Sequence, residues 1–374
     1  MSAVVVIPVV GRRQRNQFLE YPWPLYRDDP CWIPPLRLDQ KELVGYRHHP
    51  FYEKNRAQTF LAYRGREVCG RIAAIFNQVH IEHCGERRGF FGFFECVDDQ
   101  EVAEALFDAV RQWFAAQGIH GLRGPTNPGL NYVLGMLIEG FDTPPTFMMP
   151  YNPPYYARLL EGCGFRKSQD LYAYWGNLAM LPGHNAKFAP IAEQIIERYN
   201  IRVRGLDRSR FQADVEAFLR VYNRSMAHHW GFVPMSAGEV SHMAKGLRHL
   251  IVPEMTAAAE IDGQLVGVVF ALPDYNPRIK QIDGRLFPFG FIRLLRNKRQ
   301  IRKIRIVAAN VVPEYQRLGV GLVLLRSLIP KGLDWGLQEA EFSWVAESNS
   351  LSRGSLEKGG AKRIKTFRMY DWDA

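Results

Sequence analysis

Residues 311–321 read Val311-Val312-Pro313-Glu314-Tyr315-Gln316-Arg317-Leu318-Gly319-Val320-Gly321, and the prediction of the fold starts from them. They follow a β-rich run, residues 304–312, and lead into an apolar helical run, residues 322–328. A strand that turns through two glycines into a helix directs several backbone N–H groups and the positive end of the helix dipole into one small space. The pattern therefore predicts an anion site suited to a pyrophosphate, although ordinary strand-to-helix turns also carry such glycines.

The spacing of the glycines resembles the cofactor loop of the GNAT acyltransferase superfamily, Gln/Arg-x-x-Gly-x-Gly/Ala. In that family the loop holds the pyrophosphate of coenzyme A, and a Cβ at either glycine would obstruct the close approach of phosphate oxygens. The resemblance implies an α/β fold with a mixed sheet, in two tandem GNAT-like domains, and acyl-CoA as co-substrate. The cofactor-binding residues that it implies are Val311, Val312, Gln316, Arg317, Leu318, Gly319, Val320, Gly321 and Asn349.

Length and composition predict two domains without a metal. A chain of 374 residues that is 47% hydrophobic can build two ordinary cores. The histidine pairs His48-His49 and His228-His229 lack the spacing that places two imidazoles on one helical face. An odd set of cysteines without a C-x-x-C pair argues against a disulfide framework and a structural zinc site, and we expect reduced thiols at Cys31, Cys69, Cys84, Cys96 and Cys163.

The formal net charge of +10 favours acidic partners. These include a phosphorylated cofactor, an acyl-carrier protein and an anionic membrane surface, whereas nucleic acid is disfavoured because no known binding motif accompanies the charge. No apolar stretch reaches the roughly 20 residues of a spanning helix, and no signal pattern is evident at the N-terminus. We expect a cytoplasmic protein, with peripheral association at the inner membrane left open. Seven basic residues crowd together: Arg293, Arg296, Lys298, Arg299, Arg302, Lys303 and Arg305.

The chain also reads as a tandem repeat. Hairpin patterns at residues 60–74 and 259–270 are each followed by a strand pattern, 89–96 and 304–312, and then by a helical pattern. The helical patterns cover residues 99–117, with Asp98 as the expected N-cap, and 319–333. We predict a GNAT-like domain without a cofactor loop over residues 1–180 and an acyltransferase domain with the acyl-CoA site over residues 200–374.

The two halves differ where the helix begins. At that position the first half has Val97-Asp98-Asp99-Gln100, without glycines and with two carboxylates. Such a turn would repel a pyrophosphate, so we expect the first domain to bind no coenzyme A and to shape the substrate cleft or support the second domain.

The resemblance further implies that the strand before the loop splays from its neighbour and that a backbone N–H, of Val311 or Val312, holds the thioester carbonyl. For the general base we favour Glu347, which follows a strand next to the gap; its alternative role is to cap the helix near Ser350. His228 or His229 is the competing base, with a structural role at a helix end as its alternative. The usual tyrosine acid falls on Leu356 here, which leaves Tyr315, Tyr370, water or direct thiolate release.

Three phrases resemble a branch of two-domain bacterial GNAT proteins that includes the bacterial ceramide synthases: residues 150–156 with Gly164-Phe165, residues 230–234, and residues 344–349. This resemblance implies N-acylation of a sphingoid long-chain base. An N-acetyltransferase of a small amine or peptide, and a non-catalytic acyl-CoA or acyl-carrier-protein binding module, are the alternatives. The run 286–296 joins aromatic residues to basic ones, as an interfacial membrane contact requires, and its alternative is a core segment with a solvated basic end.

Overall fold

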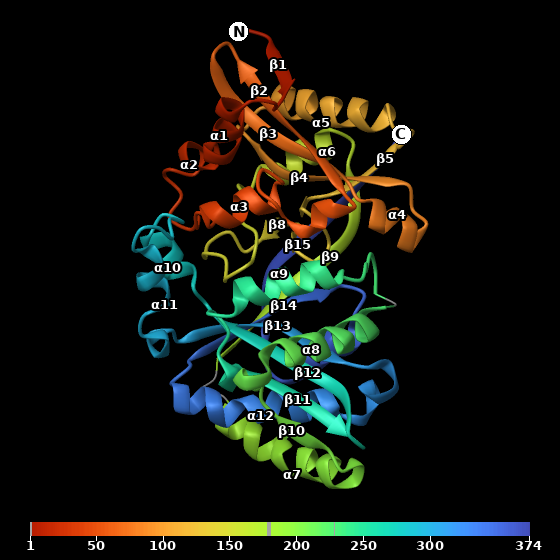
Figure 1. Cartoon of the computed structure of the whole chain (residues 1–374), viewed down its shortest axis with the longest axis vertical. Coiled ribbons are helices and arrows are strands. Elements are labelled where there is room, and N and C mark those ends of the chain that lie inside the picture. Colours follow the sequence, from red (N-terminus) through yellow and green to blue (C-terminus); the bar gives the residue numbers. More distant parts are fainter. Residues whose placement is uncertain (1, 178–180, 228) are drawn as a thin grey trace. The chain divides into compact units, whose positions relative to one another are not determined.

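The computed structural model describes residues 2–177, 181–227 and 229–374 (Figure 1). The described chain forms two compact units, each with its own set of strands and helices. The first contains the residues up to Leu171 together with Asn276–Leu294 and Lys365–Ala374, and the second contains Tyr172–Tyr275 and Leu295–Ile364.

The first unit has a sheet with the strand order β1-β2-β3-β4-β5-β15, and β8 also pairs with β15. Its strands are β1 (Val4–Pro8), β2 (Arg56–Arg64), β3 (Glu67–Phe76), β4 (Arg88–Cys96), β5 (Gly121–Gly124), β8 (Met136–Glu139), the start of β9 (Arg166–Asn177) and the end of β15 (Lys362–Asp373), with a small hairpin of β6 (Thr126–Asn127) and β7 (Val133–Leu134). Its helices are α1 (Arg12–Glu20), α2 (Pro22–Leu25), α3 (Arg37–Leu43), α4 (Gln78–Cys84), α5 (Gln100–Ala115), α6 (Tyr156–Gly162), α10 (Asn276–Gln281) and α11 (Gly290–Leu295).

Helix α5 shows how the local sequence sets the first unit. Its N-cap is Asp99, one residue beyond the predicted Asp98, and the Asp99 side chain accepts hydrogen bonds from the N–H groups of Glu101 and Val102. Apolar residues at helical spacing, among them Leu106 and Phe107, are fully buried in the hydrophobic core of this unit.

The second unit has the strand order β14-β13-β12-β11-β10, with the end of β9 beside β14. Its strands are β10 (Arg202–Arg204), β11 (Thr256–Ile261), β12 (Gln264–Pro273), β13 (Lys303–Val311) and β14 (Glu339–Ala346). Its helices are α7 (Leu181–Tyr199), α8 (Phe211–Met226), α9 (Ala237–Leu247), α12 (Val320–Trp335) and α13 (Ser350–Lys358), and a 3₁₀ turn, η6 (Pro313–Leu318), precedes α12.

The predicted elements of the second unit are present. Strands β11 and β12 form the expected hairpin through Asp262 and Gly263, whose φ angles of +50° and +75° suit a two-residue primed turn. Strand β13 and helix α12 match the predicted runs 304–312 and 319–333 to within two residues. The mixed α/β fold in tandem domains is confirmed.

The division of the chain differs from the predicted domains 1–180 and 200–374 at three places. Strand β9 passes from the first unit into the second after Leu171, and residues 276–294 belong to the first unit. The last strand, β15, ends in the first unit, where Tyr370–Asp373 pair antiparallel with Gly121–Gly124 of β5. A repeat in sequence predicts two similar halves, but it carries no information on which half receives the final strand.

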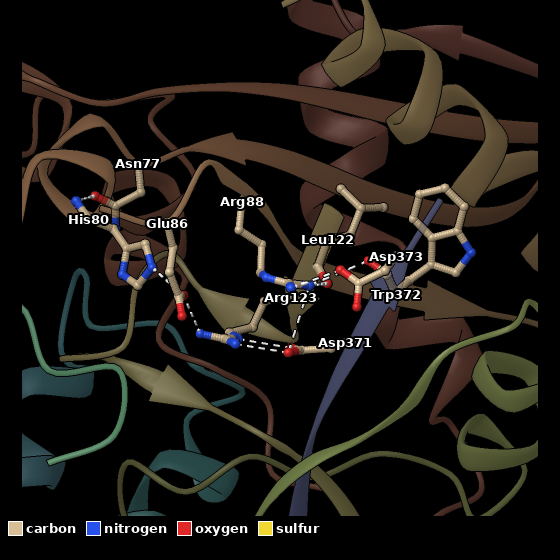
Figure 2. A network of polar contacts seen from close by, with 9 residues as sticks. All are labelled: Asn77, His80, Glu86, Arg88, Leu122, Arg123, Asp371, Trp372 and Asp373. Atoms are coloured by element: carbon tan, nitrogen blue, oxygen red, sulfur yellow. Dashed lines mark hydrogen bonds and ion pairs between the residues drawn. The ribbon is translucent and has the colours of Figure 1, made fainter. Parts of the chain in front are cut away.

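Ion pairs hold β15 in the first unit (Figure 2). Nε and Nη2 of the buried Arg123 donate to the two carboxylate oxygens of Asp371 at 2.9 and 2.8 Å, and Nη1 lies 2.9 Å from Glu86 Oε2. A second ion pair joins Arg88 Nη2 to Asp373 Oδ1 at 2.8 Å. Bidentate pairing of a buried guanidinium fixes the register of the last strand beside β5.

His80 makes the stability of this unit depend on pH. Burial lowers the pKa of its ring below the ordinary value, although a 3.2 Å contact with Glu86 opposes this. The unfolded histidine therefore binds a proton at higher pH than the folded one, so stability is complete above about pH 6.5 and falls as the pH drops below it. His80→Phe, which preserves the edge-to-face contact with Phe90, should flatten this loss.

Urea midpoints of the wild type and His80→Phe at about pH 7.5 and pH 5 test this expectation. His120→Asn, which changes an exposed histidine of the same unit, is the matched control and should keep the wild-type pH dependence. Equal pH dependence in His80→Phe and the wild type would contradict the assignment.

Two further findings concern only the residues described. None of their helices combines the length and the apolar character needed to cross a bilayer. The same residues contain no group of three histidine, cysteine or acidic side chains able to hold a metal ion. The five cysteines are unpaired. The absence of a bound metal stays a prediction.

Candidate active site

Strands β13 and β14 of the second unit separate along their length. They pair in parallel from Lys303 and Glu339 as far as Ile306 and Phe342, where their pairing within the described chain ends. Both strands continue, and a register shift between β12 and β13 marks a bulge at Val307. The separation that the family resemblance implied is therefore present, and we call the region beside residues 307–311 the strand gap.

The N–H of Val311 faces the strand gap. In an antiparallel pair successive N–H groups point to alternate sides of the strand. The N–H of Val312 donates to the carbonyl oxygen of Val266 in the neighbouring segment at 2.9 Å, so that of Val311 points away from β12. Gln316 Nε2 donates to the Val311 carbonyl oxygen at 3.1 Å and ties the loop to the strand end. The prediction that Val312 could hold a carbonyl is wrong, because its donor is already used.

The two glycines of the loop, Gly319 and Gly321, differ in what surrounds them. Gly319 lies at φ +81° as the N-cap of α12, and a Cβ there would fall 2.5 Å from Ile195 Cδ1 on α7. A Cβ on Gly321 would meet only Val311 Cγ2, at 4.0 Å. The described chain leaves the space beside Gly321 open, so its role toward a cofactor stays a prediction, whereas backbone conformation and packing within the unit explain Gly319.

Two backbone N–H groups at the start of α12 could donate to a ligand. The N–H groups of Leu322 and Val323 donate to the Gly319 carbonyl oxygen at 3.0 and 3.2 Å. Those of Val320 and Gly321 come before the first turn is closed, so they have no acceptor within the helix. They lie directly after the loop that Gln316 ties to β13. The geometry suits an anionic group bound at this helix start.

The remaining loop side chains have surface and packing roles. Arg317 is exposed. Leu318 and Tyr315 are half-buried and pack against the hydrophobic core of the unit. Glu314 Oε1 pairs with Arg224 Nη2 on α8 at 3.0 Å. Nothing in these contacts favours Tyr315 as an acid.

Glu347 and Asn349 follow β14. Glu347 is half-buried at the turn between β14 and α13. Asn349 is the N-cap of α13, because its Oδ1 accepts a hydrogen bond from the N–H of Ser352 at 3.0 Å. Asn349, rather than Glu347, therefore occupies the N-cap position of this helix. The oxygen of Asn349, predicted to contact the cofactor, is engaged by its own helix.

The competing base candidates lie beyond the end of α8. His228 is outside the described residues. The N–H of His229 donates to the Met226 carbonyl oxygen at 2.8 Å, and the His229 carbonyl oxygen accepts from Phe232 at 3.1 Å. These bonds place the His229 backbone in the turn that follows α8, and its role as a base stays a prediction.

Two positions near the carboxyl end of the chain concern the general acid: Tyr370, and Leu356 where the family usually has a tyrosine. The Tyr370 hydroxyl belongs to the first unit, where it donates to Glu161 Oε1 at 3.1 Å. Leu356, at the position of the usual acid, packs against a small cluster around Tyr174. Burial raises the pKa of Tyr370 above its ordinary value.

A polar connection between α8 and β13 was missed in the sequence. Asn310, next to Val311, donates through Nδ2 to Ser225 Oγ at 2.8 Å, and the Ser225 hydroxyl donates to the Tyr222 carbonyl oxygen at 2.9 Å. Burial raises the pKa of Tyr222 to about 12, so this phenol stays neutral. A polar residue inside the apolar run 304–312 was the available signal.

Arg305 was counted among the basic residues facing anionic partners, and the structure corrects this. Its side chain is only 2% exposed, and Nε and Nη2 donate to Oγ and the carbonyl oxygen of Ser343 at 2.9 and 3.1 Å. The Ser343 hydroxyl donates in turn to Glu341 Oε1 at 2.8 Å. Burial lowers the pKa of Arg305 to about 10, against the favourable effect of Glu341. This buried series of hydrogen bonds joins β13 to β14 just before the two strands separate.

In the first unit, residues of the protein itself fill the places that correspond to the strand gap and to the start of α12. The N–H of Phe93, at a bulge of β4 with φ +50°, donates to Asn127 Oδ1 at 2.7 Å. A Cβ on Gly92 would fall 1.7 Å from the Thr126 carbonyl oxygen. The start of α5 is occupied by the carboxylate of Asp99. The N–H of Phe93, which could bind a thioester carbonyl, and the start of α5, which could bind a pyrophosphate, are thus both occupied by side chains of the protein itself.

Comparison with known proteins gives close matches over the whole chain, although no protein-family model matches it. Protein YghO of Escherichia coli K12 is 33% identical over 370 residues, which cover 97% of this chain and 93% of YghO. The bacterial ceramide synthase of Caulobacter vibrioides is 32% identical over 376 residues, covering 98% and 96%. Among solved structures, a tandem GNAT protein from the clavulanic acid biosynthesis pathway superposes with a TM-score of 0.55 at 11% identity, covering 99% and 98%, and it shares the fold.

Proposed function

This chain belongs to the tandem-domain GNAT acyltransferases that include bacterial ceramide synthase, and on that premise we propose that it N-acylates a sphingoid long-chain base with an acyl group from acyl-CoA. It is an acyltransferase. The observation that carries the proposal is the strand gap beside the loop 316–321, with the Val311 N–H directed into it. The lipid acceptor is supported by the name of the Caulobacter relative.

The residues present fit a nucleotide thioester. The N–H groups of Val320 and Gly321, with the helix dipole of α12, would bind the pyrophosphate. The N–H of Val311 would hold the thioester carbonyl oxygen and stabilise the charge that develops on it during attack. Bound acyl-CoA supplies the activated acyl group. Gln316, through its bond to the Val311 carbonyl oxygen, keeps strand end and loop in register.

Acyl transfer requires a free amine and a leaving thiolate. We propose that Glu347 accepts the proton of the acceptor amine, because it follows the separated end of β14. The amine nitrogen then bonds to the carbonyl carbon as the carbon–sulfur bond breaks. Tyr315 packs against the core and Tyr370 lies in the first unit, so we propose that the thiolate leaves directly and takes its proton from water.

Side chains along the gap favour a long acyl group over acetyl. Ala308 and Ala309 contribute only methyl groups, and Ala309 is exposed. Each methylene buried by the protein contributes about 0.8 kcal/mol. An acyl chain running along these alanines would therefore bind more tightly as it lengthens. Acyl-carrier protein stays an alternative donor, since it presents the same phosphopantetheine arm.

Acyl-CoA chain length tests the proposed substrate class. With sphinganine as acceptor, kcat/KM should rise by about 100-fold from acetyl-CoA to long-chain acyl-CoA, the equivalent of a few buried methylenes. Ala309→Phe should lower the long-chain rate and leave the acetyl rate nearly unchanged. Turnover of acetyl-CoA alone would favour a small amine or peptide as acceptor, and binding without turnover would favour a non-catalytic module.

A lipid acceptor would have to be collected from a bilayer. We therefore place the enzyme at the cytoplasmic face of the inner membrane, in peripheral association with anionic lipid. The location follows from the acceptor, and sedimentation with membranes after cell lysis would test it.

A further inference from the structure

We propose that residues 285–293 form a docking surface for bilayers that contain anionic phospholipid. The segment lies in the insertion between β12 and β13 that contains α10 and α11, drawn in teal in Figure 1, and its residues belong to the first unit. The inference stands without the proposed acceptor, because it rests on exposure, anchoring and charge in this segment alone.

The first observation is a group of large apolar side chains in solvent. Phe287 and Phe289 are 72% and 73% exposed, and Phe291 and Ile292 are 42% and 48% exposed. The ring centroids of Phe287 and Phe291 lie 6.2 Å apart, so these two side chains are neighbours. We call these four residues the aromatic tip. Single exposed apolar residues are ordinary, but four within six positions mark an interaction surface.

The second observation is that the base of the segment is firmly held. Asp283 accepts hydrogen bonds from Trp23 Nε1 at 2.6 Å and from Arg37 Nη2 at 2.9 Å. Gly284, at φ +67°, packs so closely that a Cβ would fall 2.1 Å from the Pro35 carbonyl oxygen. At the other end, Arg278 Nη1 donates to the carbonyl oxygen of the buried Leu294 at 3.0 Å. The tip is therefore presented by an ordered base.

The third observation is the sign of the charge around the tip. Arg285 and Arg293 flank it, and both are exposed. Arg285 lies 3.5 Å from Asp283, which also pairs with Arg37, and Arg37 pairs in turn with Glu20. No acidic residue occurs from position 284 to position 313. The segment that carries the tip is therefore net positive.

These features together select the occupant. Aromatic and aliphatic side chains between arginines match the boundary between acyl chains and anionic headgroups. A second copy of the chain is a poorer fit, because two such segments meeting about a twofold axis would bring arginines of like charge together. An apolar pocket of another protein would need carboxylates at its rim, and it would not bind lipid vesicles.

Vesicle sedimentation with the full chain tests the proposal. Binding to vesicles of phosphatidylcholine with phosphatidylglycerol should exceed binding to phosphatidylcholine alone and should fall as salt is added. Phe287→Ser/Phe289→Ser should weaken binding about tenfold or more, and Arg293→Gln should weaken binding only to the anionic vesicles. Val10→Ser and Arg12→Gln, at exposed positions of the same unit, are the matched controls and should bind like the wild type.

A second measurement does not depend on loss of binding. Phe289→Trp should show a blue-shifted emission and reduced quenching by acrylamide when anionic vesicles are added. Vesicle binding that is unchanged in Phe287→Ser/Phe289→Ser would overturn the proposal. So would a concentration-dependent dimer that the same substitutions abolish, with no binding to vesicles, because the tip would then be a contact between copies.

Discussion

Replacing Gly321 with aspartate should strongly weaken acyl-CoA binding while leaving the fold intact. The Cβ has room, since its nearest neighbour would be Val311 Cγ2 at 4.0 Å. A carboxylate in the first turn of α12 is favourable for the helix itself, so the melting temperature should stay equal or rise slightly. The same carboxylate would stand where we place the pyrophosphate, and like charges would repel it. We expect acyl-CoA affinity to fall about 100-fold, which corresponds to about 2.7 kcal/mol.

Titration calorimetry with a non-reactive acyl-CoA analogue measures this effect, and thermal melting reports the fold. Gly246→Asp on α9 is the matched control, because a Cβ there meets nothing within 4 Å. It should bind the analogue as the wild type does. Undiminished binding in Gly321→Asp would show that the nucleotide lies elsewhere. Gly319→Ala would be a poor choice, since it strains a left-handed backbone and clashes with Ile195 before any ligand is considered.

Replacing Glu347 with glutamine should lower kcat by about 100- to 1,000-fold, in the range that a general base contributes. Glutamine preserves the size of the side chain and its hydrogen-bonding capacity, but it cannot accept the amine proton. Affinity for acyl-CoA should be unchanged, since the loop 316–321 is untouched. The decline of kcat/KM at low pH, which reports the essential base of the free enzyme, should disappear in the variant.

His229→Gln and His228→Gln separate Glu347 from its competitors. If a histidine were the base, its variant would lose the activity and Glu347→Gln would keep it. Glu254→Gln, an exposed carboxylate of the same unit, controls for the loss of one negative charge and should retain normal turnover. Activity unaffected by all three substitutions at positions 228, 229 and 347 would point to a non-enzymatic proton acceptor such as bulk water.

Much of the second unit could be predicted because its signals are local. The hairpin pattern at residues 259–270 predicted β11, β12 and their turn, the β-rich run 304–312 predicted β13, and the glycines predicted the start of α12. The opening between β13 and β14 came from the family resemblance, since pairing register has no local signature. The prediction of the elements thus rested on period and turn chemistry.

The errors at the site share one cause, which is a partner distant in sequence. The N–H of Val312 donates to the carbonyl oxygen of Val266 and is therefore not available to a thioester. The Arg305 side chain is buried and donates to Ser343, 38 positions away. Packing against Ile195 on α7 is a further reason for glycine at position 319, and the sequence pattern did not indicate it. A residue's type indicates what it can bond, whereas the fold determines what is within reach.

The pairing of β15 with β5 has a consequence for biosynthesis. The strand residues 370–373 that complete the first unit are translated after all of the strands β10 to β14 of the second unit. Until then the nascent amino-terminal unit lacks the Asp371 carboxylate for Arg123 and has an unpaired edge at β5. The first unit therefore cannot be completed before the strands of the second have been synthesised, and the waiting intermediate is one that chaperones would be expected to engage.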